Sequence, residues 1–347
     1  MKPFVEALKK ELCLRKGYLQ DEPLQTIYFG GGTPSSISPN VYQDLFEVIH
    51  EHFQVDTKAE ITLEANPDDL SKNYLQALAD LPFNRLSIGI QSFVDEELTF
   101  LNRRHNAQEA LDAVSSSREA GIDNISIDLI YGLPGQTRES WKASLETALS
   151  LQVPHISAYS LTYEEGTKLW SLLATGKVRE VDEELSLSFF NMLMDDLSEA
   201  GYEHYEVSNF CKPGFRSRHN SSYWEGVNYL GLGPSAHSYD GTSREWNVRS
   251  IQKYIEEIKN NAPIVEKEIL SVVERYNDLV ITRLRTQEGI RLADVEAVFG
   301  VEVLNYLLRQ ADKHQLLGHV NIEGDCLFLT RRGLFVSDGV MVDLMMN

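Results

Sequence analysis

A run of three glycines is the feature of this chain that most strongly indicates a ligand site. Gly30, Gly31 and Gly32 follow the β-forming residues 26–29, and Thr33 and Pro34 come directly after them. Glycines at the end of a strand remove the Cβ atoms where another group must approach the backbone closely. The spacing is neither the G-x-G-x-x-G of a dinucleotide site nor the G-K-S/T of a phosphate loop. The alternative to a binding loop is a tight turn between a strand and a helix.

Polar side chains also lie at the ends of other apolar, β-forming segments. Glu64, Gln91 and Asp128 each lie at or near the end of a β-forming segment. One such residue is ordinary, but repetition of the pattern at successive strand ends is how the catalytic face of a barrel is built. The sequence therefore predicts that these strand ends share one active-site face.

These residues must be positioned by a repeating arrangement of strands and helices. Strands are expected at residues 26–32, 61–66, 85–92, 124–132 and 155–162. Helical patterns follow at residues 41–52, 72–79, 95–101, 108–120 and 138–151. This spacing is that of β–α repeats and implies an α/β fold with a parallel sheet and right-handed crossovers.

Composition narrows the classes of partner. The 347 residues are 42% hydrophobic and carry a formal net charge of −20, which disfavours nucleic acid and anionic membrane surfaces. No apolar stretch is long enough to span a bilayer, and residues 1–12 read as an amphipathic helix rather than a signal peptide, so we expect no stable membrane insertion. Cys13, Cys211 and Cys326 are widely separated, which suggests reduced thiols and a cytoplasmic location.

Five motifs carry a resemblance to a known family. They are GGGTPS (30–35), EANP (64–67), LSIGIQSF (86–93), DLIYGLPGQT (128–137) and YSLTYEEGT (159–167). With these motifs in this order, the chain resembles the radical S-adenosylmethionine (SAM) proteins related to oxygen-independent coproporphyrinogen III oxidase. Within that group it is most similar to the heme chaperone branch. The resemblance covers nearly the whole chain and implies a partial (β/α)6 barrel of the TIM type, here lacking its first strand.

The resemblance also implies a set of SAM ligands. Gly31, Gly32 and Thr33 would contact the methionine part, whereas the amino, carboxylate and ribose groups would be held by Glu64, Gln91, Arg103 and Asp128. The chemistry is compatible, because a zwitterion needs an anion for its ammonium group and a cation for its carboxylate, and ribose hydroxyls suit a carboxylate acceptor. Structural alternatives are open: Arg103 could complement a helix end, Glu64 could cap a helix, and Gln91 could bind loop amides.

One element of the family pattern is absent. Radical SAM chemistry needs a [4Fe–4S] cluster held by a C-x3-C-x2-C motif just after the first barrel strand, but this chain starts inside the helix expected over residues 3–15, and its cysteines lack that spacing. We therefore expect no metal ligands and no 5′-deoxyadenosyl radical from the chain as given, and an unpaired sheet edge at residues 26–32. A start site placed too late and a genuine loss are both open. We favour the first, because the SAM residues are retained.

A second region combines histidine with aromatic residues. His219, Asn220, Tyr223 and Trp224 resemble the H-N-x-x-Y-W motif that the heme chaperone branch associates with heme handling. An imidazole can ligate heme iron, and aromatic faces can pack a macrocycle. The alternative is a hydrogen-bonded loop histidine beside rings that fill the barrel mouth. Heme or a porphyrin is thus a candidate ligand, and a heme-acceptor protein is a candidate partner.

The last part of the chain changes character. Helices are expected at residues 271–284, 292–299 and 303–314, then a hairpin at 319–330 and a last helix after Arg331. This order suggests a winged-helix-like module, and the absence of a concentrated basic stripe disfavours DNA binding. The expected parts are the barrel (1–200), a barrel-closing aromatic and histidine-bearing segment with a connector (201–262), and the C-terminal helical module (263–347).

Three functional hypotheses follow. The favoured one is a heme chaperone of the radical SAM family, which binds heme and transfers it to acceptor proteins. The alternative is an oxygen-independent coproporphyrinogen III oxidase, which decarboxylates propionates to give protoporphyrinogen IX, and whether the chain is an enzyme stays open. The third is a barrel that binds SAM without redox chemistry or an unrelated hydrolase, and no nucleophile elbow or paired-metal spacing supports a hydrolase.

Overall fold

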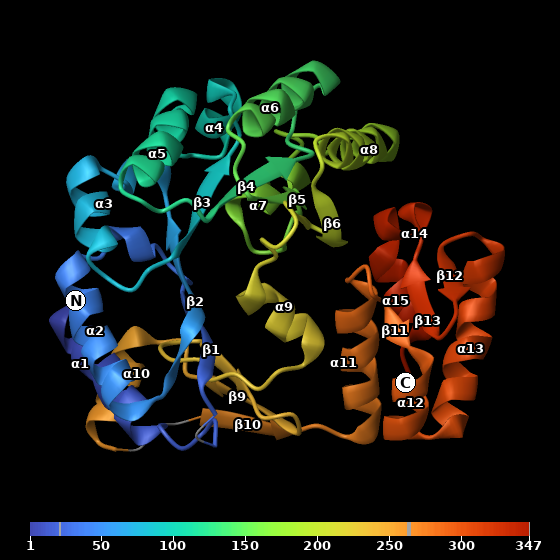
Figure 1. Ribbon diagram of the computed structural model, residues 1–347. Coiled ribbons are helices and arrows are strands. Elements are labelled where there is room, and N and C mark those ends of the chain that lie inside the picture. The colour runs from blue at the N-terminus through green and yellow to red at the C-terminus, as the bar shows by residue number, and fades with distance from the viewer. Residues whose placement is uncertain (21, 262–264, 347) are drawn as a thin grey trace. The chain divides into compact units, whose positions relative to one another are not determined.

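A curled, mainly parallel sheet positions the glycine run and the polar strand ends (Figure 1). Its strands, in the order in which they lie side by side, are β1 (Leu24–Phe29), β2 (Val55–Ala65), β3 (Arg85–Gln91), β4 (Ile125–Tyr131), β5 (His155–Ser160), β7 (Asn209–Cys211) and β6 (Glu203–Glu206). Strands β2 to β5 pair in parallel, whereas β7 pairs antiparallel with both β5 and β6. The expected α/β half-barrel is confirmed, and β1 stands at one end of its strand order. The antiparallel β6–β7 pair at the other end was not expected as strands.

The computed structural model describes residues 1–20, 22–261 and 265–346. Contacts divide the chain into two units, each discontinuous in sequence. The barrel unit comprises Tyr28–Ile37 and Glu60–Ser217, and the second unit comprises Met1–Ile27, Ser38–Ala59 and Arg218–Asn347. This division differs from the sequence-based boundaries at 200 and 262, the second of which falls outside the described residues. The difference arises because β1 and β2 each run from the second unit into the barrel unit.

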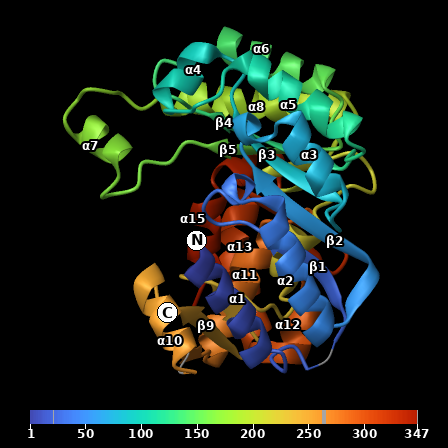
Figure 2. The ribbon, with the colours of Figure 1, turned by 90° about the vertical axis from the view of Figure 1, so that its left-hand side faces the viewer.

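The two faces of the barrel sheet differ in polarity. On β3, Leu86, Ile88 and Ile90 are fully buried and alternate with the inward residues Ser87 and Gly89. Helices cover the apolar outer face (Figures 1 and 2): α3 (Lys72–Ala79), α4 (Asp95–Phe100), α5 (Ala107–Glu119), α6 (Arg138–Ser150) and α8 (Glu183–Glu199). Figure 2 shows α7 (Lys168–Ala174) standing away from them, and none of its residues is buried. The inner face is therefore left to polar side chains.

Among its described residues, the second unit contains two hydrophobic clusters and two small antiparallel sheets. Its first helices are α1 (Lys2–Leu14), α2 (Pro39–His52), α9 (Arg218–Glu225) and α10 (Ile251–Lys259), with strands β8 (His237–Tyr239), β9 (Ser243–Asn247) and β10 (Val265–Ile269) in the order β10-β9-β8. Its C-terminal part holds α11 (Val272–Leu284), β11 (Ile290–Arg291), α12 (Leu292–Phe299), α13 (Val301–Leu316), β12 (Val320–Glu323), β13 (Cys326–Leu329), α14 (Arg331–Phe335) and α15 (Ser337–Leu344) around one core. The expected three helices and hairpin are present there. The short strand β11 and the splitting of the last helix are additions.

Most barrel elements begin and end close to their expected positions, but β2 starts six residues before the expected Ile61. Residues 55–60 include Asp56, Lys58 and Glu60, so their composition conceals a strand. Pairing with β1 stabilises this extension, and the Leu24 amide donates to the Gln54 carbonyl just before it (2.8 Å).

Candidate functional site

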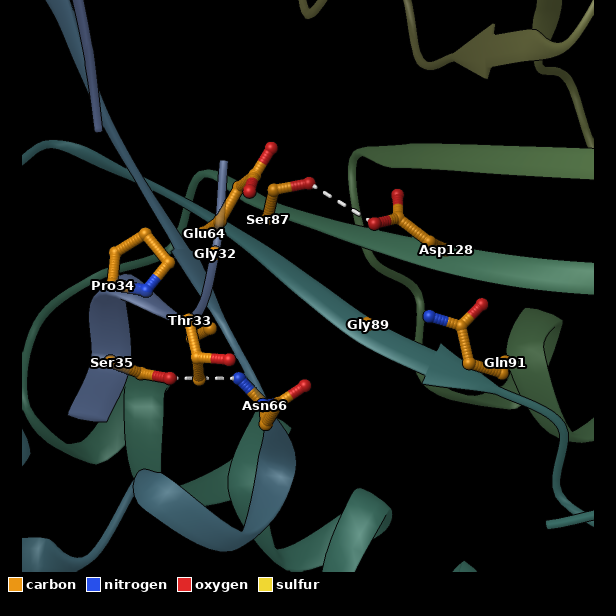
Figure 3. A pocket seen from close by; sticks show the side chains of 11 residues that line it. Gly32, Thr33, Pro34, Ser35, Glu64, Asn66, Ser87, Gly89, Gln91 and Asp128 are labelled. Atoms are coloured by element: carbon orange, nitrogen blue, oxygen red, sulfur yellow. Dashed lines mark hydrogen bonds between the residues drawn. The ribbon is translucent and has the colours of Figure 1, made fainter. Parts of the chain in front are cut away.

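A pocket lies at the carboxyl ends of β2 and β3, against Asp128 in the middle of β4 and beside the loop that follows β1 (Figure 3). Five of the seven predicted SAM ligands line it: Gly32, Thr33, Glu64, Gln91 and Asp128. In a parallel sheet these strand ends meet at one edge, which brings residues far apart in sequence together. All of them belong to the barrel unit.

Glu64 is held at the pocket by both of its oxygens. The Tyr28 hydroxyl donates to Oε1 (2.6 Å), and the Gly31 amide donates to Oε2 (3.2 Å). Burial, followed by the charge of Glu64, raises the pKa of Tyr28, which keeps this hydroxyl protonated as a donor. A Cβ on Gly30 would lie 2.6 Å from the Tyr28 ring and 2.9 Å from Glu64 Oε1. The first glycine of the run is therefore required by the carboxylate that it approaches, and Gly31 adopts a positive φ of 101°.

Asp128 is the second carboxylate of the pocket. Burial raises the pKa of Asp128 to about 6, and the charge of Glu64 adds to the rise, whereas a hydrogen bond from Ser157 and the positive charge of Arg85 oppose it. The Ser87 hydroxyl also donates to Asp128 Oδ2 at 3.5 Å (Figure 3). At neutral pH the group is thus anionic and can accept hydrogen bonds from ligand hydroxyls.

Arg103 lies behind the pocket lining and contacts two of its members. Its Nη2 donates to Asn66 Oδ1 (2.6 Å) and to the Gly89 carbonyl (2.8 Å). Its buried Nε has no hydrogen-bond partner among the described residues. Burial lowers the pKa of the Arg103 guanidinium from the usual value. A Cβ on Gly89 would come within 2.9 Å of Gln91 Nε2 and 3.4 Å of Arg103 Nη2, so this glycine lets the two side chains approach.

Sequence reasoning missed several pocket residues. Ser35, Asn66 and Ser87 line the pocket, and Tyr28 supports it from beneath Glu64. The Ser35 hydroxyl accepts from the Asn66 amide (3.1 Å) and joins the glycine loop to the end of β2. The signal that could have found Ser87 is the polar alternation Arg85-x-Ser87-x-Gly89-x-Gln91, which marks the inward face of β3.

The residues of the proposed heme motif lie together on α9, in the second unit. His219 has partners at both ring nitrogens: Thr26 Oγ1 lies 3.0 Å from Nδ1, and the Tyr223 hydroxyl lies 3.0 Å from Nε2. Tyr223 is 37% exposed. The guanidinium of Arg285 lies over the Trp224 ring, 5.1 Å from its centroid, and Asn220 is on the same helix. The motif is thus assembled, with its histidine engaged by hydroxyl groups.

The residues of this chain do not fit a [4Fe–4S] cluster. Cys13 lies on α1, Cys211 is buried on β7, and Cys326 is on β13. Burial raises the pKa of Cys211 to about 11, which disfavours the thiolate that a metal requires. No three His, Cys, Asp or Glu side chains of the described residues form a metal-binding group. We therefore assign no residue to a cluster and derive no step through one.

Comparison with known proteins identifies the family. The Radical SAM superfamily model matches residues 5–148, and the HemN C-terminal domain model matches residues 270–336. The heme chaperone HemW of Lactococcus lactis is 38% identical over 80% of this chain and 73% of its own length. HemW of Mycobacterium tuberculosis is 32% identical over 98% of this chain and 85% of its own length. The chain belongs to the HemW family of radical SAM proteins.

A solved structure supports the fold assignment. The coproporphyrinogen III oxidase HemN from Escherichia coli superposes with a TM-score of 0.84, over 99% of this chain and 82% of that one. At 22% identity this match establishes the shared fold of the HemW-family chain and of that enzyme. None of the helices in the described ranges combines the length and apolarity needed to cross a membrane.

Proposed function

We propose that this HemW-family chain binds SAM in the barrel pocket and heme at the α9 motif, and delivers heme to an acceptor protein. The observation that carries the proposal is the 32–38% identity to several proteins named heme chaperone HemW, over most of both chains. A cytoplasmic location, expected from three widely separated cysteines, belongs to the same proposal.

The pocket chemistry supports SAM as its ligand. Glu64 and Asp128 offer carboxylates for an ammonium group and for hydroxyls, and Arg103, behind the lining, supplies a positive charge that attracts a carboxylate. SAM would supply a sulfonium-activated adenosyl and methionyl group, and the chain's own residues would bind and orient it.

The α9 motif supports heme as the second ligand, with one condition. A neutral imidazole nitrogen can ligate iron only after it is released from its hydrogen-bond partner. We propose that the Tyr223 hydroxyl is the partner that yields, because Tyr223 is exposed and lies on the same helix as His219. Thr26 would then keep hold of Nδ1 and fix the orientation of the ring, as a second-sphere partner does.

Binding and transfer test this proposal directly. The purified chain is titrated with heme by absorption spectroscopy and with SAM by calorimetry, and the heme-loaded chain is then mixed with an apo-haemoprotein. We expect saturable binding of both ligands and movement of the heme absorption band to the acceptor. If His219→Ala binds heme as tightly as the parent does, the motif is removed from the proposal. A loaded chain that keeps its heme in the presence of the acceptor would remove the delivery step.

The coproporphyrinogen oxidase alternative is not proposed. The oxidase that superposes well on this chain shares 22% identity, and this likeness carries the fold alone. Several relatives at 32–38% identity bear the chaperone name.

A further inference from the structure

A buried arginine lies beneath the SAM pocket, outside its lining. Arg85 is the first residue of β3 and precedes Ser87, Gly89 and Gln91 at intervals of two. Because side chains alternate across a strand, Arg85 faces the same side of the sheet as these three pocket residues. Its side chain is 3% exposed.

The positive charge of this guanidinium is poorly balanced by its neighbours. Its Nε and Nη1 atoms have no hydrogen-bond partner among the described residues. The nearest carboxylate is that of Glu60, with 4.0 Å between Arg85 Nε and Glu60 Oε2, beyond hydrogen-bond distance. A buried charge of this kind is costly unless other groups balance it.

The neutral groups around Arg85 supply no negative charge. His155 is fully buried between the Ser126 hydroxyl (2.7 Å from Nδ1) and the Tyr205 hydroxyl (2.8 Å from Nε2). Burial, and then the charge of Arg85, hold the pKa of His155 well below its usual value, so it stays neutral. Thr62, the cross-strand neighbour of Arg85, has a buried hydroxyl without a partner. Glu60 and Asp128 are two carboxylates that can balance the charge of Arg85, and the buried Glu206 acts on the pKa of Tyr205 in the opposite direction to Arg85.

We propose that Arg85 is a positioning residue for the pocket: its guanidinium, on the same face of β3 as Ser87 and beneath the lining, favours the anionic form of Asp128, which can then accept hydrogen bonds from a cationic ligand. This inference rests on the proposed SAM site and adds the group that sets the pH range over which the site binds SAM.

The other groups facing Asp128 explain why a buried cation is needed. Glu64 on β2 adds a like charge, and the hydroxyls of Tyr28 on β1 and Tyr159 on β5 stay protonated in their buried surroundings. Ser87 on β3 and Ser157 on β5 donate hydrogen bonds, but carry no charge. Arg103 is a second cation near Asp128, and it is held by Asn66 and the Gly89 carbonyl. Interactions between charges are strong at a site shielded from water, so loss of Arg85 would favour the protonated form of Asp128.

Two substitutions shift the charge balance in opposite directions. Arg85→Met removes the cation. Glu60→Gln removes the nearest anion of Arg85 and so increases the effect of the Arg85 charge on Asp128. Arg85→Lys is the matched control that retains the charge. SAM affinity is measured by calorimetry from pH 5 to pH 8 for each protein.

In the parent, affinity should rise with pH through about 6, where Asp128 ionises. We expect Arg85→Met to move this midpoint upward by about one pH unit or more, the usual effect of one neighbouring charge. Glu60→Gln should move it downward, and Arg85→Lys should leave it near the parent value. A merely structural role of Arg85 would change affinity or stability without displacing the midpoint.

A second measurement separates this inference from the proposed function. The carboxylate of Asp128 is titrated by infrared difference spectroscopy, with Asp128→Asn as the reference that lacks the band. If SAM fails to bind the parent, the SAM site is lost as a proposal, but the Asp128 titration still reports on Arg85. If Arg85→Met does not fold, Glu60→Gln decides. An Asp128 midpoint that is unchanged in every folded variant that alters this charge balance overturns the inference.

Discussion

The barrel pocket and the α9 motif are two candidate ligand sites built on opposite principles. In the pocket, Glu64 is fixed by Tyr28 and Gly31, and a cationic Arg103 Nε remains unpartnered. In the motif, both nitrogens of His219 already have hydroxyl partners. The pocket is therefore preorganised for a charged ligand, whereas the motif must exchange an internal hydrogen bond for a ligand contact.

The largest expected effect tests the preorganised site. Glu64→Ala should weaken SAM binding by ~1.5–3 kcal/mol, more than tenfold, because a charge-assisted hydrogen bond is lost and the Tyr28 hydroxyl loses its acceptor. Heme affinity should stay at the parent value. Calorimetry and heme titration of the same preparation check both statements, with the exposed Glu146→Ala on α6 as the matched control. Equal loss of both ligands would mean that the substitution damages the fold, and the comparison would fail.

The next effect tests the site that must rearrange. His219→Ala should weaken heme binding at least tenfold if this residue ligates iron. Tyr223→Phe should bind heme as tightly as the parent or a few-fold more tightly, because the hydrogen bond broken on ligation contributes about 1 kcal/mol. Heme titration of the two variants side by side should therefore show weaker binding for His219→Ala and no weakening for Tyr223→Phe. A parallel loss in both would assign the two residues a shared structural role.

Sequence reasoning found the pocket far better than it found the supports of that pocket. Glu64 and Gln91 stand at strand ends and Asp128 lies in the middle of β4, and motif order and β–α spacing locate all three without coordinates. Tyr28 is the penultimate residue of β1 and Arg85 is the first residue of β3, and the significance of both depends on which side chains face them across the sheet. Only the fold brings β1 to β4 into register, so their roles could not be deduced from spacing.

The motif shows a different limit. No helix was expected at residues 218–225, yet α9 places His219 and Tyr223, four residues apart, on one helix face. Thr26 lies 193 positions away, and no local pattern connects it with His219. The division into units was also hidden, because β1 and β2 are continuous segments that contribute to both.

A pH series sharpens the contrast further. Asp128 has its pKa raised to about 6, so it is neutral below that pH and anionic above it. A cationic ligand prefers the anion, and SAM affinity should therefore fall about tenfold between pH 7 and pH 5. For the ligand-free protein the sign is reversed, because a raised carboxyl pKa contributes stability at low pH that is lost as pH rises through about 6. Calorimetry of the parent against Asp128→Asn checks the trend, and a parent profile as flat as that of the variant would contradict it.

The smallest effect concerns the residues that hold the motif helix. Arg285 follows α11, and its guanidinium lies over Trp224, while Arg283 Nη2 donates to the Glu225 carbonyl at the end of α9 (3.4 Å). A cation–π contact of this kind contributes about 0.5–1 kcal/mol, so Arg285→Met should weaken heme binding by a few-fold at most.

SAM affinity should not change in Arg285→Met, because Trp224 and Arg285 both belong to the second unit and the pocket belongs to the barrel unit. The exposed Arg309→Met on α13 removes the same charge without the ring contact and serves as the control. If Arg309→Met weakens heme binding as much as Arg285→Met does, the effect is one of net charge. If only Arg285→Met does so, the C-terminal part of the chain supports the motif that must rearrange and leaves the preorganised pocket unaffected.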